Sequence, residues 1–262
     1  YLHFPQAHPP LQRLYLDLST RWNGRAAAHL LADSEATKQD LVARYSTPPE
    51  KVTVAYPGYD ETLAPVRDPT AVAAVKARYD ITGDYFLHLG TLQPRKNLSR
   101  LLAAFSNLKS ETQLVLAGRG GWLYNDLFAQ ARRMGLEDRV LFPGYIPEAD
   151  KAPLLSGALA FVFPSLYEGF GLPVLEAQAC GCPVICADTS SLPEVAGEGA
   201  LLVDPADTEG LARGMARLAQ DAALRAELVE RGFANLRRFS WERCARAVLE
   251  VIERLMEGEA QR

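Results

Sequence analysis

The sequence predicts an α/β protein with a doubly wound parallel sheet and the remnant of a second domain of the same class. Two observations predict this fold. Short β-rich runs alternate with longer helical patterns along the chain, which is typical of βαβ units and a parallel sheet. The chain has 262 residues, of which 48% are hydrophobic and 23% charged, and this suits one large or two modest globular domains.

Composition and charge exclude several classes of protein. The formal net charge is -4, so no basic face for nucleic acid is expected. No apolar run approaches the roughly 20 residues that span a bilayer, and no secretory signal pattern is visible. Four cysteines are too few for a disulfide scaffold. We therefore expect a cytoplasmic protein, with peripheral attachment to the inner face of a membrane left open.

The first 78 residues predict only a small α/β unit. Ser34 suits the N-cap of a helix, because its hydroxyl can accept a hydrogen bond from a free backbone amide. Residues 60–80 are polar and contain proline, so we place a domain boundary after residue 78. The expected elements are strands over 29–34 and 51–55, helices over 35–45 and 69–78, and a turn over 56–59.

A longer and more regular series follows and predicts an open sheet of parallel strands. The expected strands cover 85–89, 113–117, 139–142, 158–163, 183–187 and 200–203. The expected helices cover 98–108, 123–133, 148–156, 172–179, 207–219, 221–237 and 240–257. Open sheets of this kind bind ligands at the carboxyl ends of their strands, so the loops after the strands should hold the chemistry.

The first of these loops, over residues 90–97, carries two adjacent cations. Gly90 allows a ligand to approach the backbone, and Arg95 and Lys96 lie beside the start of the next helix. A helix N-terminus attracts anions through its free amides and its dipole. Arginine can fork two phosphate oxygens, and lysine supplies a point charge. The loop therefore suits a phosphate site, and an ordinary solvated basic pair is the alternative.

The loop over residues 164–176 carries two carboxylates. Glu168 lies in the loop, and Glu176 falls in the first or second turn of the helix that follows. Gly169 and Gly171 leave the backbone open to close approach. A carboxylate can accept hydrogen bonds from the vicinal hydroxyls of a sugar. The alternative is a solvated Glu168 together with a Glu176 that only stabilises the helix dipole.

Other polar features give weaker signals. The glycine-rich loop over 118–122 lacks the spacing of a dinucleotide fingerprint, and the loop over 143–147 could read the edge of a base or be a plain turn. His88 lies inside an apolar strand and is expected in the core. No paired metal-binding motif is present, so no zinc is expected. Three clustered cysteines are expected to be buried thiols: Cys180, Cys182 and Cys186.

Several segments match a known family. The segment P-S-x-x-E-G-F-G-L-P-x-x-E-A contains an E-x7-E motif formed by Glu168 and Glu176. Further matches are G-T-L-x-P-R-K-N at 90–97, A-C-G-x-P-V-I at 179–185, S-L-P-E-V at 191–195 and L-V-D-P at 202–205. Together these segments resemble the retaining glycosyltransferases of family four. The resemblance covers residues 85–207 and implies the GT-B architecture of two facing Rossmann-like domains.

The resemblance implies a role for each matched residue. Arg95 and Lys96 should bind the donor diphosphate, Glu176 should hold the ribose hydroxyls, and Glu168 should contact the transferred sugar. Glu168, Arg95 and Lys96 are therefore the expected catalytic residues. The other residues expected at the donor are Gly90, Ile146 near the base, and Gly169, Phe170, Gly171 and Leu172 through their backbone.

The resemblance also implies a division of the chain. Residues 1–78 match the tail of the family's N-terminal acceptor domain, 79–238 the nucleotide-sugar-binding domain, and 239–262 a C-terminal helix that packs back toward the acceptor domain. We expect the rest of the acceptor domain to be missing from this chain. A helix that lies on a membrane is the alternative for the last segment, although its polar face mixes glutamate with arginine.

The implied reaction is transfer of a sugar from a nucleotide-sugar donor to a glycan or lipid-linked acceptor with retention of configuration. Two cations and a helix N-terminus would stabilise the leaving diphosphate, so neither a metal nor another cofactor is expected. Front-side attack through an oxocarbenium-like state is favoured over a covalent intermediate on Glu168.

The donor and the alternatives follow from the same resemblance. The segment at 90–97, followed by L-A-G-x-x-G-W at 116–122, resembles members that use GDP-mannose to build surface polysaccharides. A catalytically silent nucleotide-sugar-binding fragment is the alternative function. A pyridoxal-phosphate glucan phosphorylase is disfavoured, because nothing resembles its cofactor-lysine segment.

Overall fold

The computed structural model describes Phe4 and residues 9–108, 110–121 and 124–260. Contacts between residues divide the chain into two compact units, Tyr1–Tyr59 with Arg238–Arg262 and Asp60–Arg237. The sequence placed the division after residue 78. Residues 69–78 belong with the second unit, because Val75 lies in its core and Arg78 binds Asp150 there.

The second unit is built on a six-stranded parallel sheet with the order β5-β4-β3-β6-β7-β8. The chain runs outward from β3 to β5 and then returns to place β6 on the other side of β3. This reversal confirms the predicted doubly wound α/β class, and it places a ligand crevice beyond the carboxyl ends of β3 and β6. The strands are β3 (Tyr85–Leu89), β4 (Gln113–Ala117), β5 (Val140–Gly144), β6 (Ala160–Phe163), β7 (Val184–Ala187) and β8 (Ala200–Val203).

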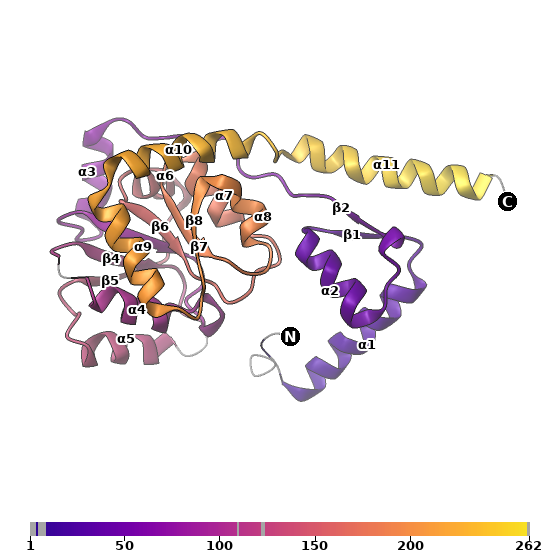
Figure 1. The fold of residues 1–262 in the computed structure, drawn as a ribbon, viewed down its shortest axis with the longest axis horizontal. Helices are drawn as coiled ribbons and strands as arrows, with labels where there is room; N and C mark the ends of the chain where they lie inside the picture. The colour runs from indigo at the N-terminus through magenta and orange to yellow at the C-terminus, as the bar shows by residue number, and fades with distance from the viewer. Residues whose placement is uncertain (1–3, 5–8, 109, 122–123, 261–262) are drawn as a thin grey trace. The chain divides into compact units, whose positions relative to one another are not determined.

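Helices cover both faces of this sheet (Figure 1). Successive residues of a strand face opposite sides, so Phe86 lies in the core cluster that includes residues of α4, α5, α9 and α10, whereas Leu87 lies in the cluster that includes residues of α3, α6, α7 and α8. Both side chains are fully buried. The helices are α3 (Pro69–Arg78), α4 (Leu98–Ser106), α5 (Tyr124–Arg133), α6 (Glu148–Ser156), α7 (Leu172–Ala179), α8 (Leu192–Ala196), α9 (Thr208–Gln220) and α10 (Ala222–Leu236).

The first unit contains a two-stranded parallel sheet, in which Leu30 pairs with Val52. Ser34 accepts a hydrogen bond from the backbone amide of Thr37 at 3.0 Å, which confirms the predicted N-cap. Gly58 packs so closely against the start of the last helix that a Cβ there would lie 2.3 Å from the backbone nitrogen of Trp241. The elements are α1 (Pro10–Ala26), β1 (Leu30–Ala32), α2 (Glu35–Tyr45), η2 (Pro49–Lys51), β2 (Val52–Val54) and α11 (Trp241–Ala260).

Most predicted elements are present, and the described residues contain further helices that were not predicted. Helices α2, α3, α6 and α7 begin and end at the predicted residues. The additions are α1, α8 and three 3-10 turns, namely η2, η3 (Pro94–Lys96) in the first strand-end loop, and η4 (Gly197–Gly199). The predicted start of α5 at Leu123 lies outside the described residues. Of the helices that the structure describes, none is both long enough and apolar enough to cross a bilayer.

Candidate functional site

A buried ion cluster joins the loops that follow β3 and β6. The ammonium nitrogen of Lys96 lies 2.7 Å from Oε1 of Glu168, and the guanidinium of Arg95 pairs with Oε2. Lys96 is 7% exposed and Glu168 is 8% exposed. Burial by itself raises the pKa of Glu168, but the charges and hydrogen bonds of Lys96 and Arg95 outweigh burial and hold that pKa below its usual range. This favours an ionised Glu168 at neutral pH, while burial holds the pKa of Lys96 below its usual value.

The 3-10 turn η3 and the residue after it give the two cations a fixed backbone. Asn97 adopts the left-handed conformation with a φ of 60° and begins α4. Its side-chain amide donates to the carbonyls of Pro164 at 3.1 Å and Pro205 at 2.8 Å, so it joins the loops after β6 and β8. Arg95 donates to the carbonyl of Tyr167 at 2.6 Å. The loops after β3 and β6 are thus joined by backbone contacts as well as by the ion cluster.

Two serines of the loop after β7 hold the backbone around Glu168. The amide of Glu168 donates to the hydroxyl of Ser190 at 3.0 Å. The hydroxyl of Ser191 lies 3.0 Å from the carbonyl of Glu168 and 2.5 Å from that of Phe170. Neither serine was among the predicted site residues, although Ser191 begins one of the family-like segments. Glu168 is therefore held from two other loops, through its carboxylate by the loop after β3 and through its backbone by the loop after β7.

The N-terminus of α7 begins immediately after this backbone. Gly171 has a φ of 122°, and a Cβ there would lie 2.9 Å from Leu192, so the position requires glycine. Within the described residues, no side chain caps this helix start. Free amides at a helix N-terminus attract anions. The predicted stretch from Gly169 to Leu172 thus lies between the ion cluster and an anion-attracting helix end.

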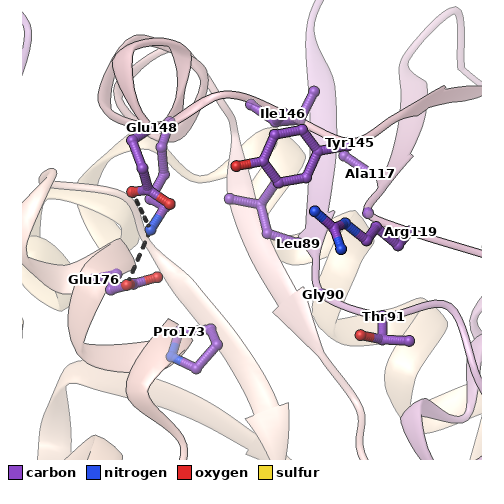
Figure 2. A pocket seen from close by; sticks show the side chains of 12 residues that line it. Leu89, Gly90, Thr91, Ala117, Arg119, Tyr145, Ile146, Glu148, Pro173 and Glu176 are labelled. Carbon is purple, nitrogen blue, oxygen red and sulfur yellow. Dashed lines mark hydrogen bonds and ion pairs between the residues drawn. The ribbon is translucent and has the colours of Figure 1, made fainter.

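A pocket of about 280 Å³ opens beside the ion cluster at the same edge of the sheet. One ammonium group joins two carboxylates in its wall, because Lys151 lies 2.7 Å from Glu148 and 3.1 Å from Glu176 (Figure 2). Burial by itself lowers the pKa of Lys151, but hydrogen bonds and charges from both glutamates raise that pKa above its usual value. The pocket is lined by Leu89, Gly90, Thr91, Ala117, Gly118, Arg119, Tyr145, Ile146, Glu148, Lys151, Pro173 and Glu176.

The predicted site residues fall into two adjoining groups. Gly90, Ile146 and Glu176 line the pocket, whereas Arg95, Lys96 and Glu168 form the ion cluster. Gly90 connects the groups, because a Cβ on it would lie 3.8 Å from the ammonium nitrogen of Lys96. The structure therefore brings all the predicted strand-end residues to one edge of the sheet.

Sequence reasoning missed several residues of the pocket wall. These are Thr91, Arg119, Tyr145, Glu148 and Lys151. The sequence contained a signal for Glu148 and Lys151. They are spaced i, i+3 in the first turn of a predicted helix that follows a strand-end loop, so their side chains can pair. Trp122, which belongs to the GDP-mannose-like segment, lies outside the described residues.

His88 and the clustered cysteines lie in the core, as predicted. His88 is fully buried, Nδ1 contacts the carbonyl of Val162 at 3.0 Å, and burial lowers the pKa of the imidazole to about 4. Cys180, Cys182 and Cys186 are buried free thiols. Within the described part of the chain, no three histidine, cysteine or acidic side chains gather as they would around a metal ion.

Comparison with known proteins identifies the family. The family model for "Glycosyl transferases group 1" matches residues 76–234, so the chain belongs to this family. The O-antigen chain mannosyltransferase B of Escherichia coli is 34% identical over 245 residues, which cover 92% of this chain and 64% of that protein. A D-inositol 3-phosphate glycosyltransferase of Streptomyces bingchenggensis is 32% identical over 248 residues, or 89% of this chain and 54% of that protein. The chain thus spans less than two thirds of the length of both relatives.

Solved structures share the fold. A sucrose-phosphate synthase from Thermosynechococcus elongatus aligns with a TM-score of 0.82 and 26% identity, over 97% of this chain and 64% of that chain. The HepE protein of Anabaena, solved in complex with UDP and glucose, aligns with a TM-score of 0.83 and 23% identity, over 94% of this chain and 68% of that chain. These alignments confirm the predicted Rossmann-like fold of GT-B glycosyltransferases.

The ion cluster predicts a specific pH dependence of stability. The folded-state pKa of Glu168 is lowered from 4.5, so its contribution is complete above about pH 4.5 and is lost as the pH falls through the folded value. Glu168→Gln should therefore destabilise the protein at neutral pH, and the difference from wild type should narrow as the pH falls below 4.5. Denaturant unfolding of both proteins at several pH values measures this. A difference that stays constant down to pH 3 would show that the cluster does not stabilise the fold electrostatically.

Proposed function

We propose that the protein to which this chain belongs transfers a sugar from a nucleotide-sugar donor to a glycan or lipid-linked acceptor with retention of configuration. The observation that carries the proposal is the position of the ion cluster. It adjoins, through Gly90, a pocket that is lined by Pro173 and Glu176 of α7, and both lie at the carboxyl ends of the two central strands. Family membership supports the same class of reaction.

GDP-mannose is the proposed donor. Relatives that are 34% and 30% identical are named mannosyltransferases of Escherichia coli, one for the O-antigen chain and one described as serotype-specific. The first name concerns the O-antigen chain, which supports a glycan or lipid-linked acceptor and is compatible with the proposed work at the inner face of a membrane. The sequence resemblance to members that use GDP-mannose points the same way.

In the proposed chemistry, Arg95 and Lys96 stabilise the leaving diphosphate. Negative charge develops on the diphosphate as the bond to the sugar breaks, and fixed positive groups stabilise that charge most when water is excluded. Lys96 is buried, Arg95 is half-buried, and α7 begins four residues after Glu168, which pairs with both cations. These groups can do this work without a metal ion, so we propose that donor binding is metal-independent.

In this proposal the two glutamates bind different parts of the donor. Glu176, at the pocket, accepts hydrogen bonds from the ribose hydroxyls, and Glu168, in the ion cluster, contacts hydroxyls of the transferred sugar. Both carboxylates already have cationic partners in the structure, Lys151 and the Lys96–Arg95 pair. Glu168 is poorly suited to be a covalent nucleophile, because two cations hold its oxygens. Front-side attack assisted by the leaving phosphate is therefore favoured.

Donor binding in the presence of a chelator tests the proposed function. Calorimetry should detect GDP and GDP-mannose binding to the chain, with affinity unchanged by EDTA. Transfer of mannose is then measured with a panel of glycan and lipid-linked acceptors, and the anomeric configuration of the product is determined. Binding without transfer would support the alternative of a nucleotide-sugar-binding module. Absence of binding to every nucleotide sugar, or a strict requirement for magnesium or manganese, would contradict the proposal.

Removal of either cation should weaken diphosphate binding. Lys96→Ala and Arg95→Ala should each reduce the affinity for GDP by about 1–3 kcal/mol, the range of a charge-assisted hydrogen bond. Arg132→Ala is a matched control, because this arginine is 82% exposed on α5. Calorimetry of the three variants measures the effect. Unchanged affinity in both Lys96→Ala and Arg95→Ala would contradict the assignment of these residues to the diphosphate. It would not contradict nucleotide binding in the pocket.

The division of work between the glutamates gives a separate prediction. Glu176→Gln should weaken binding of the nucleoside diphosphate itself, because it acts on the ribose. Glu168→Gln should change nucleoside diphosphate binding little but weaken binding of the full nucleotide sugar. The ratio of the two affinities in each variant is the readout, with thermal unfolding as a control for folding. Equal losses of nucleoside diphosphate binding in both variants would show that the assignment is wrong.

A further inference from the structure

Arg119 and Tyr145 form a part of the pocket wall to which the proposed function gives no role. They come from the loops after β4 and β5, and the guanidinium carbon of Arg119 lies 5.2 Å from the centroid of the Tyr145 ring. Figure 2 shows the guanidinium beside this ring, turned toward the part of the pocket near Gly90 and Thr91. A guanidinium on an aromatic face is attracted by the ring and has its plane held, while its N–H groups stay available.

The backbone of Arg119 is fixed by both neighbouring loops. Its carbonyl accepts a hydrogen bond from the amide of Leu92 at 3.0 Å, and the amide of Gly121 donates to the carbonyl of Leu92 at 3.0 Å. The amide of Gly118 donates to the carbonyl of Gly144 at 2.7 Å. The backbone that carries Arg119 is therefore ordered before any ligand binds, and its exposed side chain lines the pocket. Such preorganisation reduces the entropy lost on binding.

The charge of Arg119 has no counter-ion in the described part of the chain. Lys96, Arg95 and Lys151, in contrast, are each paired with a carboxylate at this edge of the sheet. An unpaired guanidinium in a pocket suits two adjacent acceptor atoms on a ligand, because its N–H groups form a planar fork.

The position of the Arg119 guanidinium favours contact with the base of the donor rather than with its phosphates. Tyr145 is adjacent in sequence to Ile146, the residue expected near the base, and both line the pocket. The phosphates have the separate ion cluster with its own two cations. Among the bases, guanine presents two adjacent acceptors, O6 and N7, which arginine binds in a bidentate manner. Adenine pairs its N7 with an amino donor, and uracil has no N7.

We propose that Arg119, held by Tyr145, selects a guanine nucleotide by donating two hydrogen bonds to O6 and N7 of the base. This inference rests on the proposed function, because it assumes that the pocket holds the nucleotide of the donor. It makes Arg119 a specificity-determining residue and predicts preference for GDP over ADP and UDP.

The test combines variants of Arg119 with a guanine analogue that lacks one acceptor. Affinities for GDP, 7-deaza-GDP and UDP are measured by calorimetry for the wild type, Arg119→Ala and Arg119→Lys. The wild type should bind 7-deaza-GDP at least about 5-fold more weakly than GDP, because one hydrogen bond to a charged donor is lost. Arg119→Ala should lower GDP affinity, leave UDP affinity unchanged, and bind GDP and 7-deaza-GDP equally. Arg119→Lys should behave nearly as the alanine variant does, because an ammonium group lacks the fork.

Each other outcome contradicts the inference. Equal losses for GDP, 7-deaza-GDP and UDP in Arg119→Ala, with recovery in Arg119→Lys, would assign Arg119 to the diphosphate instead. Unchanged GDP affinity in both variants would overturn the role in base selection while leaving the proposed function standing. A wild type that prefers UDP would overturn both this role and the choice of GDP-mannose as donor, but not transfer from a nucleotide sugar. A wild type that binds none of the three nucleotides would refute the proposed function as well. Arg132→Ala serves again as the control for loss of an exposed arginine.

Discussion

The ion cluster of Glu168 with Lys96 and Arg95 is the constraint on which the arrangement of the strand ends depends. A carboxylate that is 8% exposed would be strongly destabilising without partners, and loss of one partner of such a pair leaves an uncompensated buried charge. Lys96 and Glu168 are 72 residues apart in sequence, so their pairing requires β3 and β6 to be neighbours. The left-handed Asn97 and the hydroxyl of Ser191 then hold the backbone on either side of the cluster.

The sequence predicted the fold well because its local signals agree with the tertiary structure. The strand-end glycines and the N-cap Ser34 mark boundaries that depend only on local backbone chemistry. Helix α1 was not predicted. It starts at Pro10 with no capping side chain in the described structure, and its apolar residues Leu11 and Trp22 are 83% and 71% exposed. Helix α8, which spans Leu192–Ala196, is too short to show a helical period.

The candidate site was predicted residue by residue but not as a set of contacts. The sequence placed Lys96 and Glu168 at strand ends and assigned them to different parts of a donor. It could not show that they bind each other, because that contact follows from the strand order β3-β6. The link between Lys151 and Glu176 was missed for the same reason, since these residues lie on different helices. Arg119 was not predicted, because it lies in a glycine-rich loop whose position depends on backbone hydrogen bonds with Leu92.

These pairings change how donor binding should be understood under the proposed function. Both carboxylates assigned to the donor already bind cations in the free protein, so sugar and ribose hydroxyls would meet carboxylates whose charge is already compensated. The net free energy of the new hydrogen bonds is then smaller than their gross strength. Affinity must then come disproportionately from groups that are unpaired beforehand. In the described structure these include the start of α7, where no side chain caps the helix, and the guanidinium of Arg119, one suited to the diphosphate and the other to the base. Under this view the ion cluster and the Lys151 bridge keep the site folded and charge-balanced without a ligand, while α7 and Arg119 supply the preference for a particular nucleotide.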